Sequence, residues 1–192
     1  SQNVLGVLDV ALDMRLVDPD APDEPNSKLN QATRKIHEIW KATSKDRPTQ
    51  LVFLDFGTPG DSKATTKIRV RAEDGHELES YESPKLNLYD EMRKKLIAMG
   101  VPRDEMEFIH DWQSEKEGAE KSPGSLYDRV NEGAVRIMFA SSAKGGVGVN
   151  VQKRMIALHH LDVPFTPDKL EQREGRIIRQ GNMHPEVQIY NW

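Results

Sequence analysis

The chain has 192 residues, of which 36% are hydrophobic and 30% charged, so its length supports one compact domain with a well-buried core. It contains no cysteine, which excludes disulfides and thiolate metal sites and suits a reducing, cytoplasmic location. The formal net charge of −4 argues against binding nucleic acid through bulk charge alone. No apolar run reaches the length of a membrane span, so we expect no membrane partner.

The first part of the chain is predicted to be helical. Residues 4–14 have the apolar spacing of a helix, and the Pro- and Asp-rich stretch 18–26 interrupts it. We interpret residues 1–26 as an N-terminal helix and linker. Ser27 is then a good N-cap for a helix across 28–45. The apolar stripe of that helix consists of Leu29, Ile36, Ile39 and Trp40.

A short apolar run and a longer polar segment follow. Residues 51–55 (LVFLD) are typical of a strand that is buried on both faces. Residues 57–84 are rich in Gly, Ser, Thr, Lys and Glu, and we interpret them as an insertion into the core domain. Within this insertion, residues 67–80 alternate in the manner of an exposed hairpin that turns at Asp74 and Gly75.

Helices and strands alternate through the rest of the chain. The predicted elements are a helix across 86–99 that ends at Gly100, strand 108–110, helix 124–131, strand 135–140, strand 154–160, helix 168–179 and strand 187–192. This alternation predicts an α/β fold with a mainly parallel sheet that helices cover on both faces. In such sheets, ligands bind at the carboxyl ends of the strands.

A Gly-rich segment, 141–150 (SSAKGGVGVN), directly follows one of the predicted strands. Glycines let a backbone approach a phosphate closely and present a nest of N–H donors. The hydroxyl of Ser142 and the ammonium of Lys144 would add to these donors. The alternative is a tight turn that needs glycine only for its conformation.

An arginine-rich segment, 172–181 (QREGRIIRQG), lies on the last predicted helix. On a helix, Gln172, Arg176 and Arg179 occupy positions i, i+4 and i+7 and share one face. Two guanidinium groups one turn apart suit polyanionic oxygens. The alternative is a solvated face on which neighbouring glutamates such as Glu174 pair with the arginines.

The charge is unevenly distributed along the chain. Between Arg136 and Gly181 there are eight Lys and Arg residues and four Asp and Glu residues, so this stretch is +4 and the remainder is −8. A locally basic stretch that contains both segments suits an edge that binds phosphate groups.

The order of these segments resembles a known family. This order resembles the second RecA-like lobe of superfamily 2 helicases, in the Swi/Snf-like branch. It consists of the Gly-rich turn, a strand, the run LDVPFTP and the arginine helix. The matching stretches are 50–56 (motif IV), 141–152 (motif V), 161–167 (the segment after it), 172–182 (motif VI) and 27–29 (the start of the lobe's first helix). Gly175 stands where chromatin remodellers have an acid. The sequence also resembles the helicase part of large phage or plasmid helicase–adenine methylase fusion proteins.

The resemblance implies a RecA-like three-layer fold for residues 27–192 and a role as half of an ATP-dependent DNA helicase or translocase. In that family ATP and Mg²⁺ are bound mainly by the first lobe. Neither its P-loop, GxxxxGK[ST], nor a DEAH-like box occurs in this sequence, so we expect this chain alone to be inactive. The expected partners are DNA, the first RecA-like lobe and a fused methylase domain.

The resemblance also assigns roles to individual residues. Arg179 would be the arginine finger, and Arg176 its phosphate-contacting companion. The residues assigned to the nucleotide side are Gln172, Gly148 and Asn150. The residues assigned to the DNA backbone are Ser142, Lys144, Gly145 and Gly146. Contacts to phosphates bind without regard to sequence, as a translocase requires.

Three other interpretations fit parts of the sequence. Residues 144–148 (KGGVG) match the start of the P-loop of ParA-type ATPases, but Val149 and Asn150 replace its Lys-Thr or Lys-Ser. Residues 162–165 (DVPF) differ by one residue from the D-P-P-[Y/F] motif of DNA adenine methylases, and 53–60 faintly resembles a cofactor glycine loop. The third interpretation is a RecA-like lobe that serves only as a docking module.

Several conspicuous side chains receive ordinary structural roles. His159 and His160 are adjacent on a predicted strand and point to opposite faces, so we expect no shared metal site. His110 and Asp111 are expected in a turn or a loop that faces DNA. The aromatic residues predicted in the core are Trp40 and Phe53. Those predicted on the surface are Trp112 and Trp192.

Overall fold

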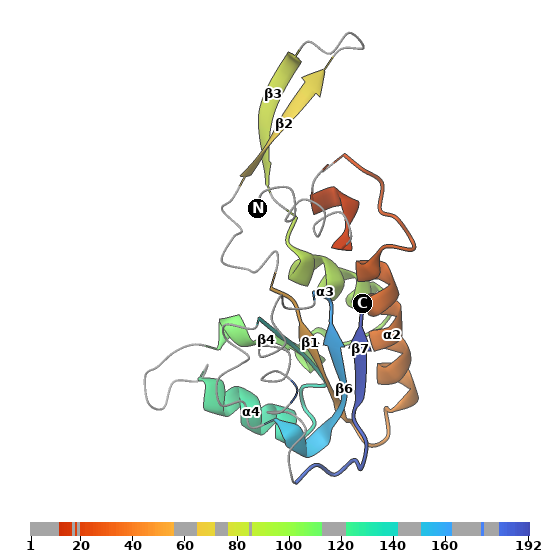
Figure 1. Ribbon diagram of the computed structural model, residues 1–192. Coiled ribbons are helices and arrows are strands. Elements are labelled where there is room, and N and C mark those ends of the chain that lie inside the picture. Colours follow the sequence, from red (N-terminus) through yellow and green to blue (C-terminus); the bar gives the residue numbers. More distant parts are fainter. Residues whose placement is uncertain are drawn as a thin grey trace.

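The computed structural model describes residues 12–16, 18, 20–55, 65–71, 77–84, 86–112, 122–141, 151–162, 174 and 181–192 (Figure 1). For residues 65–71 and 77–84, and for Pro123, it describes the backbone only. None of the helices within these ranges is long and apolar enough to cross a membrane.

Five parallel strands form the central sheet. Their order across the sheet is β4 (Met106–Phe108), β5 (Ile137–Ala140), β1 (Thr49–Phe53), β6 (Met155–His160) and β7 (Gln188–Asn191). β1 lies in the middle, between β5 and β6, and every one of its residues is buried. The buried strand predicted at 51–55 is therefore confirmed, although β1 begins and ends slightly earlier.

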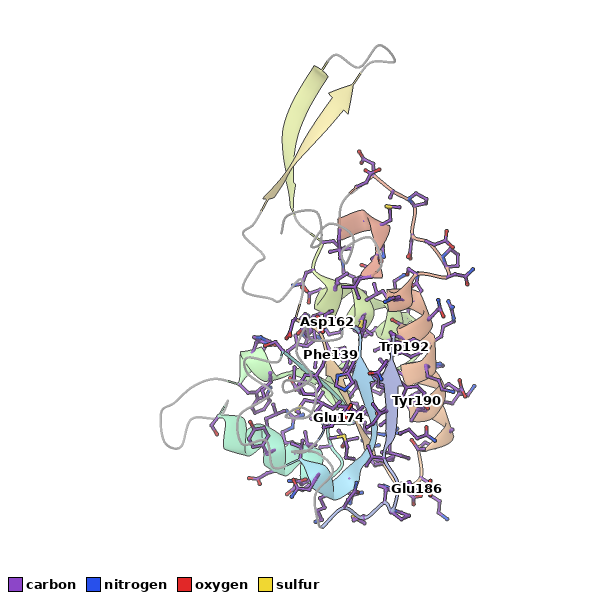
Figure 2. The ribbon with its side chains drawn as sticks, viewed as in Figure 1. Phe139, Asp162, Glu174, Glu186, Tyr190 and Trp192 are labelled. Carbon is purple, nitrogen blue, oxygen red and sulfur yellow. The ribbon has the colours of Figure 1, made fainter. Side chains whose placement is uncertain are left out.

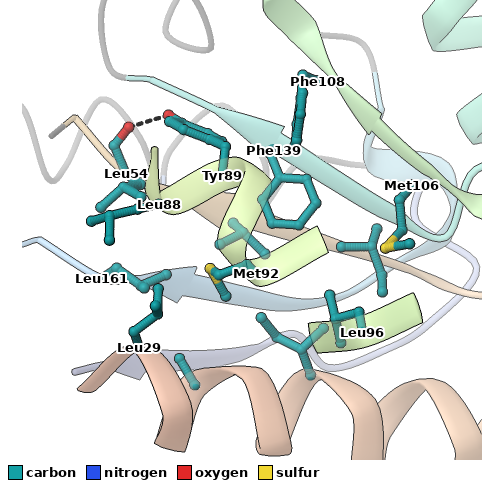
Figure 3. Close-up of a cluster of buried hydrophobic side chains, with 14 of the residues drawn as sticks. Leu29, Leu54, Leu88, Tyr89, Met92, Leu96, Met106, Phe108, Phe139 and Leu161 are labelled. Carbon is teal, nitrogen blue, oxygen red and sulfur yellow. Dashed lines mark hydrogen bonds between the residues drawn. The ribbon is translucent and has the colours of Figure 1, made fainter. Parts of the chain in front are cut away.

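Helices cover both faces of this sheet. The described α-helices are α2 (Lys28–Ala42), α3 (Leu88–Ala98) and α4 (Pro123–Asn131). On one face, Leu29 of α2 and Met92 of α3 pack in one cluster with Phe139 of β5 (Figure 3). On the other face, Leu126 of α4 packs in a second cluster with Phe53 of β1. The predicted α/β architecture, with a parallel sheet between two helical layers, is confirmed.

A hairpin forms a small sheet of its own. β2 (Thr65–Arg71) and β3 (Glu77–Pro84) pair antiparallel, as the sequence predicts within the segment 57–84. Figure 1 shows this hairpin projecting away from the five-stranded sheet. The turn predicted at Asp74 and Gly75 lies outside the described residues, and the boundaries of the insertion stay a prediction.

Capping residues decide where the helices begin and end. The Ser27 hydroxyl accepts the Asn30 N–H at 3.2 Å, which starts α2 where the sequence predicts. α2 ends at Ala42, before residue 45. The N–H and the hydroxyl of Thr43, the next residue, both donate to the Ile39 carbonyl. After α3, Gly100 has a φ of +99°, the left-handed conformation expected of the residue that terminates a helix.

Some predicted strands are displaced. The strand predicted at 108–110 is wrong in position. The residues that pair with β5 are those of β4, which ends at Phe108, and Ile109–Asp111 form a 3₁₀ turn, η4. The strand predicted at 135–140 begins at Ile137, although the Arg136 carbonyl still accepts the Gln50 N–H at 2.8 Å. β6 begins after another 3₁₀ turn, η5 (Gln152–Arg154). Most of the helices predicted at 4–14 and 168–179 lies outside the described residues.

Both tryptophans predicted on the surface are more buried than expected. Trp112 is only 5% exposed, packs in the cluster beneath α4, and donates from Nε1 to Glu107 at 3.0 Å. Trp192 is partly buried against the cluster beneath α2. These predictions are wrong because burial here comes from distant parts of the chain. Phe53 is fully buried, and Trp40 packs at the border of the first cluster.

Residues ahead of α2 also belong to the packed domain. Leu12 lies in the same cluster as α2 and α3. Arg15 forms ion pairs with Asp13 at 2.7 Å, with Asp23 at 3.1 Å and with Glu91 of α3 at 3.0 Å. The hydrogen bond to Asp13 is the main reason that the pKa of Arg15 is raised. Within the stretch that the sequence assigns to a helix and linker, Arg15 therefore forms a direct ion pair with α3.

Candidate functional site

The residues predicted to contact nucleotide or DNA lie outside the described residues, so their roles stay predictions. They are Ser142, Lys144, Gly145, Gly146, Gly148, Asn150, Gln172, Arg176 and Arg179. The structure does describe their neighbours in the chain. Ser141 is the first residue of the Gly-rich segment, Val151 directly follows that segment, and Glu174 lies within the arginine-rich segment. These neighbours define the candidate site.

His110 and Ser141 join the carboxyl ends of β4 and β5. Ser141 directly follows β5, is 5% exposed, and its Oγ lies 3.2 Å from Nε2 of His110. His110 lies in η4, immediately after β4, so the turn expected there is confirmed. The Gly-rich segment therefore begins from a residue whose side chain is hydrogen-bonded to the neighbouring strand end.

Tyr89 joins β5 to β1. It is fully buried at the start of α3, and its hydroxyl contacts two main-chain carbonyls, those of Leu54 and Ala140, the latter at 3.1 Å (Figure 3). Its ring also meets the His110 ring edge-on, with centroids 5.9 Å apart. The sequence does not single out Tyr89, because a tyrosine on a helix is indistinguishable from ordinary core packing until its partners are known.

Asp162 joins β1 to β6. It is 8% exposed, and its carboxylate accepts the backbone N–H of Asp55. The main chain continues this link, because the Leu161 N–H donates to the Phe53 carbonyl at 3.1 Å. In the adenine methylase interpretation, Asp162 would bind the target amine. In the structure, one of its oxygens accepts a hydrogen bond within the fold.

His160 joins β6 to the arginine-rich segment. Its ring is fully buried and stacks on Phe53 of β1, with centroids 5.8 Å apart. Its Nε2 lies 3.6 Å from Oε1 of Glu174, whose side chain is 28% exposed. Asp162 and Glu174 are both labelled in Figure 2. Glu174 therefore faces the sheet.

The neighbouring His159 belongs to the opposite face. Its Nε2 lies 3.0 Å from the Gln50 side-chain oxygen, and the Gln50 amide donates to the Ile36 carbonyl of α2. Its ring also stacks on Tyr190 of β7 at 4.9 Å. Burial, with a smaller contribution from His160, lowers the pKa of His159 to about 3, so it is neutral near pH 7. The prediction that the two histidines point to opposite faces is confirmed.

Side chains thus link each neighbouring pair of strand ends from β4 to β6, and Glu174 continues the series. This is the edge at which parallel α/β sheets bind ligands. In the part of the chain that the structure describes, no group of three or more His, Asp or Glu side chains is arranged to hold a metal ion. The edge brings together the starting point of the Gly-rich segment and one residue of the arginine-rich segment.

The parallel sheet with helices on both faces is the RecA-like α/β fold found in helicase ATPase domains. No protein-family model and no curated protein matches the chain.

Solved structures do match. The C-terminal part of the Fun30 ATPase domain has a TM-score of 0.54 and 15% sequence identity, over 100% of this chain and 49% of that chain. The DUF1998 helicase MrfA bound to DNA and AMPPNP has a TM-score of 0.46 and 14% identity, over 83% of this chain and 17% of that chain. The E. coli DEAD-box protein SrmB bound to RraA has a TM-score of 0.45 and 16% identity, over 85% and 72%. The Fun30 match shows a shared fold, and the chain spans about half the length of that structure.

Proposed function

We propose that this chain is the second motor lobe of an ATP-dependent DNA helicase or translocase, of the Swi/Snf-like branch of superfamily 2. The order of its Gly-rich and arginine-rich segments supports this proposal, as does its RecA-like fold. DNA and a first RecA-like lobe are the proposed partners. ATP and Mg²⁺ would be bound mainly by that first lobe, since this sequence has no P-loop.

The contact between Glu174 and His160 is the observation that carries the proposal. On the helix that the sequence predicts across 168–179, successive side chains lie about 100° apart. Glu174 is then about 140–160° around the helix axis from Arg176 and Arg179. Because Glu174 faces His160 and the sheet, the two arginines of this predicted helix would point away from the core. An arginine finger needs this orientation to reach a phosphate that another lobe holds.

The donor set fits a triphosphate. Arg179 would stabilise the negative charge that develops on the transferring phosphoryl group, and Arg176 would hold phosphate oxygens beside it. Guanidinium groups suit this task because they present several N–H donors in a planar fork. Gln172, Gly148 and Asn150 are proposed on the nucleotide side. The proposed contacts to the DNA backbone are Ser142, Lys144, Gly145 and Gly146.

Substitution of Arg179 in the full-length protein tests the proposal. We expect Arg179→Ala to lower the kcat of DNA-stimulated ATP hydrolysis by roughly 10³-fold or more, the size of effect seen for arginine fingers. Arg179→Lys should be intermediate at best, because it keeps the charge and loses the fork. Arg173→Ala is the matched comparison, since it removes an arginine of the same segment that lies about 120° around the predicted helix axis from Arg179. An unchanged rate in Arg179→Ala contradicts the finger assignment.

The chain alone provides a second test. Without a P-loop, it should show no measurable ATP hydrolysis with or without DNA, and titration calorimetry should detect no binding of a methyl donor. ATP turnover by the chain alone would contradict the proposal. Binding of the methyl donor would instead favour the methylase interpretation.

A further inference from the structure

The Gly-rich segment leaves the sheet at Ser141, and the direction of that side chain is set by one hydrogen bond. The bond runs to Nε2 of His110 at 3.2 Å. A hydroxyl can donate to a neutral imidazole nitrogen or accept from a protonated one. The link therefore persists in either protonation state of His110.

His110 is itself held in place from several sides. The residues around it, Ile109 and Trp112, are 3% and 5% exposed, and the Trp112 N–H donates to the Ile109 carbonyl at 3.2 Å. The Tyr89 ring lies edge-on to the His110 ring, and the Tyr89 hydroxyl contacts the carbonyl of Ala140, the residue before Ser141. The position of the imidazole is therefore determined by the packed edge of the sheet.

From this geometry we infer that His110 is a positioning residue for the Gly-rich segment. It holds the side chain of Ser141, the residue that directly follows β5, and it thereby couples the end of β4 to the end of β5. Its consequence for DNA binding rests on the proposed function, in which Lys144 and its neighbours contact the DNA backbone. The coupling itself depends only on the sheet edge.

Hydrogen–deuterium exchange of the full-length protein measures the coupling directly. One hydrogen bond of ordinary net strength corresponds to roughly a fivefold change in a local equilibrium constant. We therefore expect His110→Ala and Ser141→Ala each to speed exchange in peptides across 141–151 about fivefold. The double variant should be no faster than either single one, because both remove the same bond. His110→Gln should restore part of the protection, since its amide nitrogen can replace Nε2.

His37→Ala is the matched control. His37 also bonds through Nε2, to the Met99 carbonyl at 3.1 Å, but it lies on α2. This variant should leave exchange across 141–151 unchanged. Unaltered exchange in His110→Ala would overturn the inference. So would faster exchange that extends through β1, because that result would mean a loss of the fold rather than of positioning.

Duplex binding separates this inference from the proposed function. With a labelled random-sequence duplex, fluorescence anisotropy should show weaker binding for His110→Ala but an unchanged salt dependence, because no phosphate-contacting charge is removed. Lys144→Ala should weaken binding and reduce the slope of log K against log salt by about one. If His110→Ala speeds exchange while neither variant alters binding, the coupling stands and the DNA role is wrong. If only Lys144→Ala weakens binding, the link from His110 to the DNA contacts is wrong.

Discussion

At the amino edge of the five-stranded sheet, charged side chains link the residues that precede the strands. At the carboxyl edge, most of the links between strand ends involve hydroxyl, imidazole and main-chain groups. The charged groups at the amino edge interact with one another and with nearby main-chain and hydroxyl groups. The carboxyl edge holds strand ends in place while the Gly-rich segment leaves from Ser141 and the arginine-rich segment meets it at Glu174.

The amino edge is built around Arg136 and Glu105. Arg136 is 2% exposed and donates to the Trp40 carbonyl at 2.7 Å and to the Thr43 hydroxyl at 3.1 Å. Glu105 lies 3.7 Å from Arg136 and accepts hydrogen bonds from Trp40 Nε1 at 2.7 Å and from Arg47 at 2.9 Å. Burial lowers the pKa of Arg136, and Glu105 opposes that effect. These charged groups pair with one another, which is typical of a cluster that stabilises the fold.

We expect stability and the proposed activity to be separable in this fold. Changes at the amino edge should alter the free energy of unfolding and leave DNA binding by the folded protein unchanged. Changes at the carboxyl edge should affect the departing segments even where the cost in stability is modest.

Glu105→Ala should have the largest effect on stability. It leaves Arg136 buried without its carboxylate, and breaking a buried ion pair on one side costs about 3–5 kcal/mol. Urea denaturation measures the loss. Glu38→Ala is the control, because its pair with Lys35 is exposed and should contribute less than about 1 kcal/mol. Equal losses in the two variants would contradict the assigned role of the amino edge.

Acid should weaken the fold through His159. Its pKa is about 3 in the folded protein, and an unfolded histidine has a pKa of about 6.5. The unfolded state therefore binds more protons below pH 6.5, and stability falls as the pH is lowered from there towards 3. Each pH unit within this window corresponds to at most about 1.4 kcal/mol. Denaturation midpoints for the wild type and His159→Gln should converge in acid, and parallel curves would refute this source of pH dependence.

Tyr89→Phe should have a smaller effect that is specific to the carboxyl edge. Loss of the hydroxyl leaves the Leu54 and Ala140 carbonyls without this partner, at a cost of about 1–3 kcal/mol. Tyr190→Phe is the matched control, because its hydroxyl bonds to the exposed Gln188 side chain, and this variant should change stability by about 0.5 kcal/mol or less. Thermal denaturation of both variants provides the measurement, and similar losses would argue against Tyr89 as a link between strands.

Ser27→Ala gives the smallest expected change and a reference point outside the links between the strand ends. Loss of the N-cap of α2 should cost about 1 kcal/mol. Ser27→Asp should retain the wild-type stability, since aspartate also accepts the Asn30 N–H. Circular dichroism during urea titration detects the difference. A loss as large as that of Glu105→Ala would mean that local caps, rather than the charged cluster, dominate the stability.

Local signals in the sequence predict the parts of the fold that local physics determines. Ser27 and Gly100 mark helix ends through hydrogen-bonding and backbone conformation that each residue type favours by itself. The apolar run of β1 identifies a central strand because it must be buried on both faces. By contrast, β4 is set by its pairing with β5, and the short run around Phe108 does not reveal its register.

The site is predictable only in part for the same reason. The order of the Gly-rich and arginine-rich segments is a property of the sequence and suffices to propose their chemistry. The contacts of Tyr89, His110 and His160 join residues far apart in the chain, and no spacing rule predicts them. Trp112 illustrates the same limit, since its burial depends on α4 and β4 together.

The ion pairs of Arg15 have a mechanical consequence. Tension applied to the chain ahead of Leu12 would reach Arg15 before it reached α2. Through Glu91 and Asp23, that load passes into α3 and into the stretch before Ser27, so two ion pairs share it in parallel. A pulling experiment on the wild type and Arg15→Ala should therefore show the leading segment peeling away at a lower force in the variant.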